Sequence, residues 1–431
     1  MTEMERENPF KKIVRAATLV EPNEFRATVL SFLFVFTLFT AYFIVRPARD
    51  AMASDWTRAD TSWLWTLTFF VSIVAVSLYG LIISRVRFSR VVPGAYIVFA
   101  LSFVGFYFAS QFVADSTTID KSFYVWLSVF SLFHASVFWS FMSGTFSKEQ
   151  APRLFAIIAT GASVGSIVGS AISGFLAEEI GVMNLMLLAA GLLLLTLPMI
   201  GRLRVLKETD LGNRELQADL SAAKRLGKNP FAGFLLFIRN PYLVMIGVFI
   251  LMYVAMSTFV YMELREMLAV YERAERTEIL GRIDFWVNIL VVLVAFFGTG
   301  RLATRFGMAA TLSLIPLLMV GGWLVVAAMP LLAALYGLQI FRKAGNYAVT
   351  KPGREMLFTQ VDDETRYKAK PVIDIVVYRG GDMATAWFHT FLKDGLAFGL
   401  AGVALVAAVI AGIWALAGVY LGRIYNKNKE Q

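Results

Sequence analysis

The chain has 431 residues, of which 58% are hydrophobic and only 16% are charged, and its formal net charge is +9. A soluble domain usually has about 25% charged residues, so the composition excludes an ordinary soluble protein and predicts a membrane protein. The complete absence of cysteine excludes disulfide bonds and thiol chemistry. Lys and Arg are enriched in the cytoplasmic loops of membrane proteins, and this enrichment is sufficient to explain the positive charge without a nucleic-acid partner.

Charge-poor runs of about 20 residues, the length that crosses a bilayer core of about 30 Å, recur along the chain. We expect the uncharged stretch 306–341, which is too long for one span, to break at Met329–Pro330. The sequence therefore predicts twelve transmembrane helices, at residues 27–46, 61–84, 91–114, 122–147, 154–177, 180–201, 240–264, 283–300, 306–328, 330–349, 371–393 and 396–422.

The distribution of basic residues predicts the orientation. Short cytoplasmic loops are enriched in Lys and Arg, and here the even-numbered loops hold most of them. The opposite loops carry acidic residues, so we expect both termini to be cytoplasmic, and the first 26 residues contain no secretory apolar segment. The basic residues of the even-numbered loops are Arg85, Arg87, Arg90, Lys148, Arg153, Arg301 and Arg305.

The longest internal hydrophilic interval, residues 202–239, divides the predicted helices into six and six. We therefore predict an N-terminal half at residues 1–201, a cytoplasmic linker at 202–239 and a C-terminal half at 240–431. The stretches "GLIISR" (80–85) and "GRLATR" (300–305) both place Gly five residues before Arg at a cytoplasmic loop. This all-α, polytopic, duplicated arrangement resembles the major facilitator fold, whose halves are related by an axis along the membrane normal.

The stretch "GASVGSIVGSAISG" places Gly161, Gly165 and Gly169 one helical turn apart. Small residues in this register allow two membrane helices to approach closely. The pattern therefore favours tight packing within one half, with a moving interface as the alternative.

Charged residues inside the predicted spans are the main candidates for function, because a charge at the centre of a membrane helix costs about 2.5–3.5 kcal/mol on insertion scales. The eleventh span contains Asp374, Arg379 and Asp382. Their spacing allows Lys370 to pair with Asp374, and Arg379 with Asp382. Such pairs either hold the bundle together or line a wet cavity, and the neighbouring Gly380 and Gly381 allow a backbone or ligand to come close to Arg379.

Other spans offer fewer charged residues. Arg342 and Lys343 are expected roughly 18–20 Å along the tenth span, where either can snorkel to the interface or face a cavity. Glu263 lies near the end of the seventh span, as an interfacial acid or a functional one. His134 and His389 are the two histidines, and we expect hydrogen-bonded core side chains with a proton relay as the alternative.

Motifs for phosphate loops, zinc sites and catalytic nucleophiles are absent from the sequence, so we predict no enzyme, no cofactor and no metal site. The stretches "YFIVRPARDAM", "FVYMELREM" and "NYAVTKPGREMLFTQVDDETRYKAKPVIDIVVYRGGD" resemble the ATP/ADP translocase family of bacteria and plastids. The resemblance implies exchange of ATP and ADP, or of a similar small anion, across the bacterial inner membrane. It also implies roles in transport for the Arg49–Asp50 pair, for Glu263 and for Lys370.

Two positions depart from the family pattern. Leu127 occupies the place of a family glutamate, and Asp382 follows the paired glycines where the family has a lysine. These two departures leave open whether the substrate is a nucleotide. They do not alter the expected fold or the expectation that the protein is a transporter.

We therefore predict a monomeric secondary transporter of an anionic solute that works by alternating access. The expected substrate-binding residues are Arg46, Arg49, Asp50, Glu263, Lys370, Arg379 and Arg342, and the expected gating or coupling residues are Asp374, Asp382 and Glu263. Arg46 can also simply snorkel to the interface, with Pro47 ending its helix. We expect Glu263 and the Arg49–Asp50 pair to close the outer side together. The alternatives are a proton-coupled carrier of a non-nucleotide solute and a lipid-handling or structural membrane protein.

Overall fold

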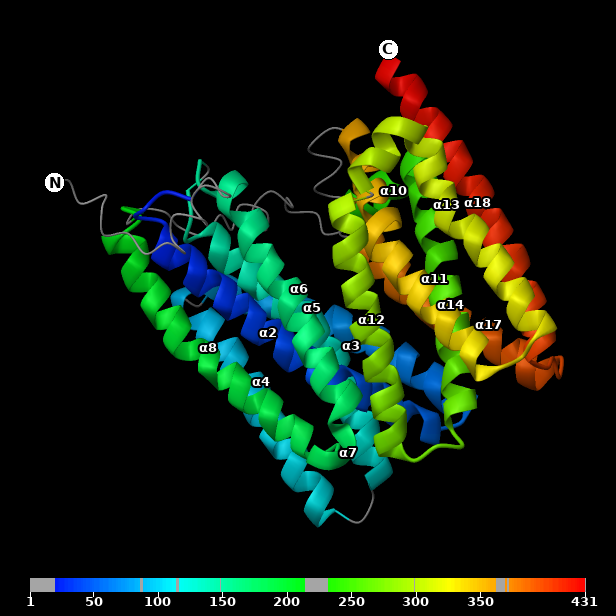
Figure 1. The fold of residues 1–431 in the computed structure, drawn as a ribbon, viewed down its shortest axis with the longest axis horizontal. Coiled ribbons are helices and arrows are strands. Elements are labelled where there is room, and N and C mark those ends of the chain that lie inside the picture. The colour runs from blue at the N-terminus through cyan, green and yellow to red at the C-terminus, as the bar shows by residue number, and fades with distance from the viewer. Residues whose placement is uncertain are drawn as a thin grey trace. The chain divides into compact units, whose positions relative to one another are not determined.

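The computed structural model describes residues 20–85, 88–113, 116–147, 149–213, 232–297, 299–361, 369 and 372–430. Throughout these residues the ordered elements are helices, as Figure 1 shows, so the all-α prediction is confirmed. Eight of the described helices are long and apolar enough to cross a membrane. The count of twelve spans stays a prediction.

The helices follow the order of the predicted spans. In the N-terminal part they are α2 (Phe25–Met52), α3 (Arg58–Arg85), α4 (Phe88–Phe112), α5 (Ser116–Ser143), α6 (Ala151–Phe175), α7 (Ala177–Ile180) and α8 (Asn184–Thr209). In the C-terminal part they are α10 (Ala232–Arg239), α11 (Pro241–Leu268), α12 (Arg273–Phe297), α13 (Thr299–Ala328), α14 (Leu332–Gly345), α15 (Lys351–Leu357), α17 (Tyr378–Thr390) and α18 (Leu400–Glu430).

The helices break at the position that the sequence predicts, between α13 and α14. α13 ends at Ala328 and α14 begins at Leu332, so the long uncharged stretch does break around Met329–Pro330. A kink within α13 lies at Gly307, whose φ of 79° is readily available only to glycine.

Three π-helical segments lie in the predicted tenth and eleventh spans: η3 (Asn346–Thr350), η5 (Val372–Val377) and η6 (Phe391–Gly395). Segments of this kind occur frequently at functional sites.

The chain forms two compact units. The first unit contains Met1–Ala48 and Val76–Leu220, and the second contains Arg49–Ala75 and Ser221–Gln431. The end of α2 and the first part of α3 therefore pack with the C-terminal helices, although they precede the linker that we predict at residues 202–239.

In the first unit, α6 packs directly on α2 through its glycines. A methyl group added to Gly161 or Gly169 would meet the carbonyl oxygen of Phe32 or Thr40 at 2.5 or 2.6 Å, and one on Gly165 would collide with the backbone of Phe36. The Thr40 hydroxyl also donates a hydrogen bond of 3.2 Å to the Gly165 carbonyl. These contacts are the close helix packing that the glycine spacing predicts.

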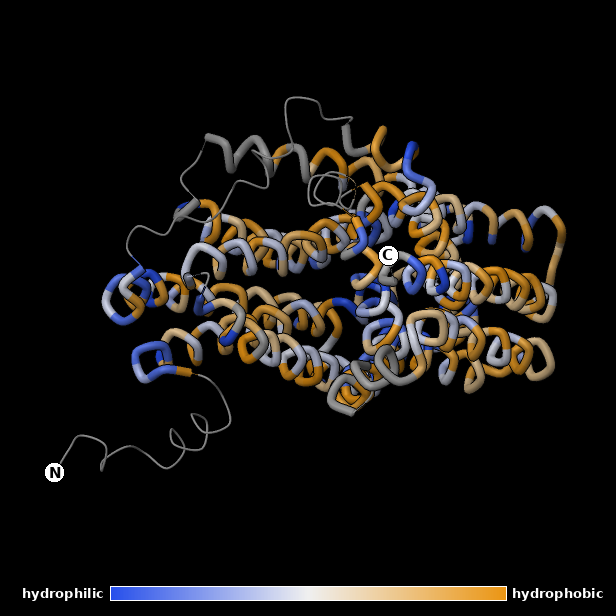
Figure 2. Tube along the Cα trace, turned by 90° about the horizontal axis from the view of Figure 1, so that it is seen from above, coloured by the Kyte–Doolittle hydropathy of each residue, from blue (hydrophilic) through white to orange (hydrophobic). Residues whose placement is uncertain are grey.

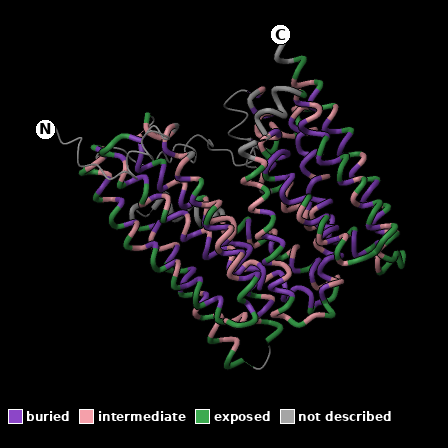
Figure 3. The backbone as a smooth tube through the Cα atoms, viewed as in Figure 1, coloured by how far each residue is buried: buried purple, intermediate pink, exposed green. Residues whose placement is uncertain are grey.

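In the second unit, α13 and α18 pack along one another. Gly418 and Gly422 of α18 approach the backbone of Leu312 and Ala309 so closely that a larger side chain would collide. Exposed and buried residues share the same helices in Figure 3, and hydrophobic residues run along most helices in Figure 2. Exposed apolar side chains on a multi-pass membrane protein are expected to contact lipid tails.

Candidate substrate and gating site

The end of α2 carries the first predicted site residues. Our prediction that Pro47 ends this helix is wrong, because α2 continues through Pro47 to Met52. Arg46, in the first unit, lies over the ring of Phe43 at 5.5 Å and the ring of Tyr42 at 6.0 Å. Arg49, in the second unit, donates hydrogen bonds of 2.9 and 2.6 Å from Nε and Nη2 to Oδ1 of Asp50.

Residues 51–62 form the α2–α3 corner, which includes the short helix η2 (Ala53–Asp55). Arg265 of α11 holds this corner: its Nη1 donates to the carbonyl oxygens of Ala53 at 2.8 Å and Trp56 at 2.9 Å, and to the Thr61 hydroxyl at 2.6 Å. The carbonyls at a helix end lack partners within the helix and carry partial negative charge, so a guanidinium is a suitable partner for them. Arg265 is itself buried.

Arg276 and Arg273 of α12 contact the same corner. Arg276 donates from Nη1 to Asp55 at 2.5 Å and to the Ala51 carbonyl at 3.3 Å. Arg273 pairs with Asp55 at 2.8 Å on a more exposed surface. The corner is therefore fixed to α11 and α12 mainly by arginines that bind backbone oxygens and one carboxylate.

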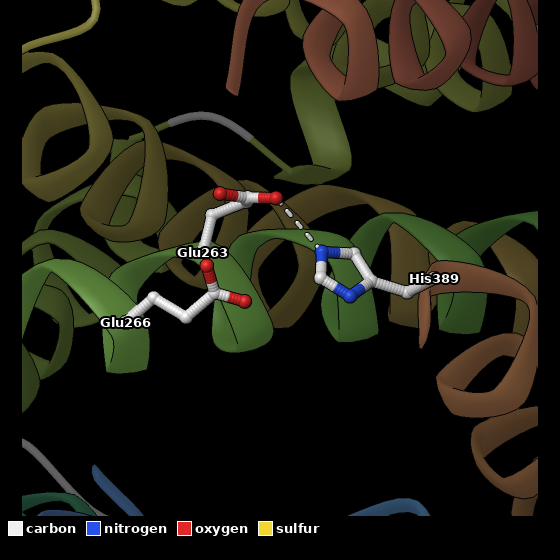
Figure 4. A group of neighbouring side chains, drawn as sticks. All are labelled: Glu263, Glu266 and His389. Carbon is white, nitrogen blue, oxygen red and sulfur yellow. Dashed lines mark hydrogen bonds and ion pairs between the residues drawn. The ribbon is translucent and has the colours of Figure 1, made fainter. Parts of the chain in front are cut away.

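Charged side chains around Glu263 form the Glu263 cluster, which consists of Arg58, Glu263, Glu266, His389, Lys393 and Asp394. Figure 4 shows Glu263 and Glu266 on α11 with His389 facing them. Oε1 of Glu263 lies 2.8 Å from Nε2 of His389, and Oε2 lies 3.1 Å from Nζ of Lys393. Glu263 and His389 are both buried. Lys393 thus fills the place beside Glu263 that we expected Arg49 to occupy.

Arg58, at the start of α3, connects the corner to this cluster. It donates to Glu266 from Nε at 2.5 Å and from Nη2 at 3.0 Å, and from Nη1 to Asp394 at 2.5 Å. Two further hydrogen bonds link α3 and α17, one between Ser62 and Thr390 and one from Trp387 to Thr66.

The Glu263, Glu266 and His389 side chains lie close enough together to hold a metal ion. Lys393 already contacts both glutamates at 3.1 Å, and Arg58 binds Glu266. The cationic groups therefore supply the positive charge that a metal ion would otherwise provide, and we interpret these residues as an ion-pair cluster.

A second polar cluster joins the middle of α11 to the last turn of α14. Arg342 donates to Oε1 of Gln339 at 3.1 and 2.8 Å and to the Tyr253 hydroxyl at 3.3 Å, and its guanidinium lies 5.8 Å from the Tyr253 ring centre. The rings of Tyr253 and Tyr378 lie 6.3 Å apart. We name Tyr253, Gln339, Arg342, Tyr378, Arg379 and Asp382 the Arg342 cluster.

Arg379 and Asp382 complete the Arg342 cluster from α17. Their charged atoms lie 3.8 Å apart, and both side chains are about one-fifth exposed. Arg342 and Arg379 both interact electrostatically with Asp382. Gly381 has a packing role, because an added methyl group would meet Leu251 of α11 at 2.8 Å.

Two further charged pairs lie in the second unit. Lys343, adjacent to Arg342, forms a buried ion pair with Asp284 of α12 at 2.6 Å, so Lys343 points into the protein instead of snorkelling. Asp374 of η5 pairs with Arg354 of α15 at 3.3 Å. Lys370, the partner that we expected for Asp374, lies outside the described residues.

Neither histidine is exposed. His134 of the first unit stacks on Tyr42 with ring centres 4.5 Å apart, and its Nδ1 lies 3.3 Å from the Phe130 carbonyl. The prediction of a hydrogen-bonded core side chain is confirmed for His134. The prediction is also confirmed for His389, which is buried and hydrogen-bonded, with the carboxylate of Glu263 as its partner.

Several site residues are absent from the set that the sequence predicts. Two of them lie one helical turn from residues that we did single out. Glu266 follows Glu263 by three residues, and Lys393 follows His389 by four, so each pair shares a helix face. Arg58 is recognisable only as a charge at a helix start, and Asp284 only as an acid at the edge of a predicted span.

Comparison with known families identifies the fold. The family model of the Major Facilitator Superfamily matches residues 31–350, more than half of the chain. The chain belongs to the major facilitator superfamily. This assignment agrees with the fold that the duplicated helix pattern predicts.

Two of the proteins similar in sequence are ADP,ATP carrier proteins of Chlamydia. The chain is 24% identical over 348 residues to the ADP,ATP carrier protein 2 of Chlamydia trachomatis serovar D, covering 70% of this chain and 64% of that protein. It is 21% identical over 333 residues to the ADP,ATP carrier protein 1 of Chlamydia pneumoniae, covering 67% and 64%. The matched region thus spans less than two thirds of each relative. The predicted resemblance to ATP/ADP translocases is confirmed.

Solved transporter structures share the fold at low sequence identity. The nucleoside transporter NupG superposes with a TM-score of 0.63 at 12% identity, covering 93% of this chain and 99% of that one. An inward-facing, unoccupied bacterial homologue of the human lysosomal transporter Spinster superposes with a TM-score of 0.59 at 13% identity, covering 95% and 99%. At these identities the likeness concerns the fold alone.

Proposed function

We propose that this major facilitator protein is a secondary active transporter of an anionic nucleotide or a related phosphorylated metabolite, which it exchanges by alternating access. The observation that carries the proposal is Arg342, a buried guanidinium of the second unit that lies beside the ring of Tyr253, which in turn lies beside the ring of Tyr378. A buried charge in a membrane helix usually faces a ligand or a wet cavity. The names of the similar ADP,ATP carrier proteins support a nucleotide as the ligand.

The Arg342 cluster contains groups for each part of such a ligand. Arg342 and Arg379 are suited to bidentate hydrogen bonds with phosphate oxygens. Tyr253 and Tyr378 present rings on which a base can stack. Asp382 can accept hydrogen bonds from an amino or hydroxyl group of the ligand. A site lined only by basic side chains would offer no such acceptor. Arg46, Arg49, Asp50 and Lys370 remain proposed further contributors.

The α2–α3 corner provides the proposed gate. Its residues belong to the N-terminal part of the sequence, yet Arg265, Arg276 and Arg58 join it to the C-terminal helices. Alternating access requires such a contact to form and break in each cycle. We propose that the corner docks when the outer side is closed and undocks when it opens, with Glu263 stabilising the docked state and with Asp374 contributing at the cytoplasmic side.

The remaining assignments follow from the charge pattern and the relatives. We propose a location in the bacterial inner membrane with both termini in the cytoplasm, since basic residues favour that side. We also propose that the protein works as a monomer.

A ligand-stabilisation experiment on the detergent-purified protein tests the substrate class. ATP or ADP is expected to raise the unfolding temperature, because a ligand at about 100 times its Kd stabilises the folded state by about 2.7 kcal/mol. Adenosine, inorganic phosphate and a dicarboxylate serve as comparison ligands. Stabilisation by adenosine or the dicarboxylate with none by any phosphorylated compound would contradict the proposal.

A further inference from the structure

Arg342 brings a buried positive charge into the second unit, and its hydrogen-bond partners are neutral. Its Nε and Nη2 donate to one oxygen of Gln339 at 3.1 and 2.8 Å, and its Nη1 donates to the Tyr253 hydroxyl at 3.3 Å. Within the described part of the chain, no carboxylate accepts a hydrogen bond from this guanidinium. A guanidinium has five N–H groups, so these three bonds leave one N–H on each Nη nitrogen for an anion.

Asp382 is the acid that partly balances this charge, and it is held loosely. It interacts electrostatically with both Arg342 and Arg379. The charged atoms of Arg379 and Asp382 lie 3.8 Å apart, which is longer than the roughly 2.7–3.2 Å of a hydrogen bond. The pair of Lys343 and Asp284 is much tighter, at 2.6 Å, and the Asp284 side chain is 4% exposed, against 18% for Asp382. Asp382 is therefore the easier of the two carboxylates to displace from its partner.

The backbone between Arg379 and Asp382 has space beside it. A methyl group added to Gly380 would meet, among the described residues, one atom of the Phe69 ring at 3.9 Å, an ordinary van der Waals distance. Gly380 lies next to Arg379 in the chain and two residues before Asp382. The loose ion pair thus lies where a ligand can approach and where the carboxylate has room to move.

The charges of the Arg342 cluster indicate what a phosphate would do there. Two arginines and one aspartate leave a net charge of one positive in the empty site. A terminal phosphate carries about 1.5 to 2 negative charges at pH 7, more than one carboxylate, and it has three acceptor oxygens. It is therefore a stronger partner for the guanidinium groups than Asp382 is. Once the phosphate is bound, Asp382 lies close to a second anion and repels it.

We propose that Asp382 is an internal substitute for the substrate phosphate. Its carboxylate balances the arginines of the empty site, the incoming phosphate displaces it, and its return speeds release of the phosphate. While displaced, the carboxylate accepts a hydrogen bond from a hydroxyl or amino group of the ligand. Asp382 thus lowers the affinity for the substrate and keeps release fast. This inference rests on the proposed transport function and deepens it, because it assigns the residue that sets the affinity of the Arg342 cluster.

Binding of ADP to the detergent-purified protein, followed by thermal stabilisation over a range of ADP concentrations, tests the inference. Asp382→Asn keeps the shape of the side chain and removes its charge. We expect this variant to unfold at a lower temperature without ligand and to bind ADP about tenfold more tightly. Unchanged or weaker binding would overturn the inference, because loss of a merely structural ion pair lowers stability without raising affinity.

Glu278→Gln is the matched control for this variant. Glu278 also pairs with an arginine on its own helix, Arg282, at 2.7 Å, and its replacement also removes one negative charge from the second unit. The control should bind ADP with wild-type affinity. A gain in affinity for Glu278→Gln equal to that for Asp382→Asn would overturn the inference, because the effect would then come from net charge alone.

A double variant keeps the test decisive if Asp382→Asn does not fold. Arg379→Gln combined with Asp382→Asn removes both members of the loose pair, and the cluster keeps its net charge of one positive through Arg342. It should bind ADP about tenfold more tightly than Arg379→Gln alone, in which Asp382 still opposes the phosphate. Equal affinity for the single and the double variant would overturn the inference.

Exchange of labelled ADP against internal ATP in liposomes separates this inference from the proposed function. Asp382→Asn should lower KM, and the maximal rate should also fall because tightly bound ADP leaves more slowly. Wild-type protein that exchanges ADP, together with an Asp382→Asn variant whose KM is not lowered, would overturn the inference alone. Absence of binding and exchange of any nucleotide by the wild-type protein would overturn the proposed function itself.

Discussion

Replacement of Arg265 by methionine is expected to release the α2–α3 corner from α11. Arg265 is the donor for the Ala53 and Trp56 carbonyls and for the Thr61 hydroxyl. Hydrogen bonds to charged groups contribute about 1.5–3 kcal/mol each, and methionine supplies none of them. A loss of about 3 kcal/mol shifts the docked–undocked equilibrium by roughly 100-fold toward the undocked state.

The absence of cysteine allows a direct measurement of this shift. A single cysteine at Ala53, which is fully buried, should react slowly with a maleimide in the otherwise unchanged protein. Adding Arg265→Met should accelerate labelling by about two orders of magnitude if labelling follows the undocked population. Arg273→Met is the matched control, because this more exposed pair with Asp55 should contribute only about 0–1 kcal/mol. Equal labelling rates for both variants would contradict the conclusion that Arg265 holds the α2–α3 corner in its docked position.

Replacement of Arg342 by glutamine is expected to weaken nucleotide binding by about 100-fold or more. Arg342 is buried and held in place by Gln339 and Tyr253, so its guanidinium is prepared for a phosphate before the ligand arrives. Truncation of one partner of a buried, hydrogen-bonded charge pair costs about 2–5 kcal/mol. Arg342→Lys should also lose most of the affinity, since lysine cannot make the bidentate contact.

The affinity is measured from nucleotide-dependent thermal stabilisation over a range of ADP concentrations. Arg282→Gln provides the matched control, because Arg282 is a half-exposed arginine that pairs with Glu278 on the same helix. It should bind ADP as the wild-type protein does. An Arg342→Gln variant that folds and binds ADP with unchanged affinity would show that the substrate does not contact the Arg342 cluster.

The fold was largely predictable, because each membrane helix leaves a long apolar run in the sequence. The break near Met329–Pro330 and the close packing at Gly165 follow from local rules for proline and for small residues. Pro47 shows the limit of such rules: the sequence favours a helix end there, and the helix continues for five residues to Met52.

The partners of the charged residues were much harder to predict. Sequence spacing reveals pairs within one helix, such as Arg379 and Asp382, because they lie one turn apart. The pairs Glu263–His389 and Lys343–Asp284 join residues 126 and 59 positions apart, and only the packing of different helices brings them together. For the same reason the sequence alone does not reveal Arg58, at the start of α3, as the partner of Glu266.

The exchange of labelled ADP in liposomes tests the central claim most directly. Purified protein should accumulate labelled ADP rapidly when the liposomes contain ATP at the same pH on both sides, and only slowly when they contain adenosine. An excess of unlabelled ATP outside should prevent accumulation. Equal uptake with either internal compound, or uptake no greater than in protein-free liposomes, would contradict a nucleotide exchanger.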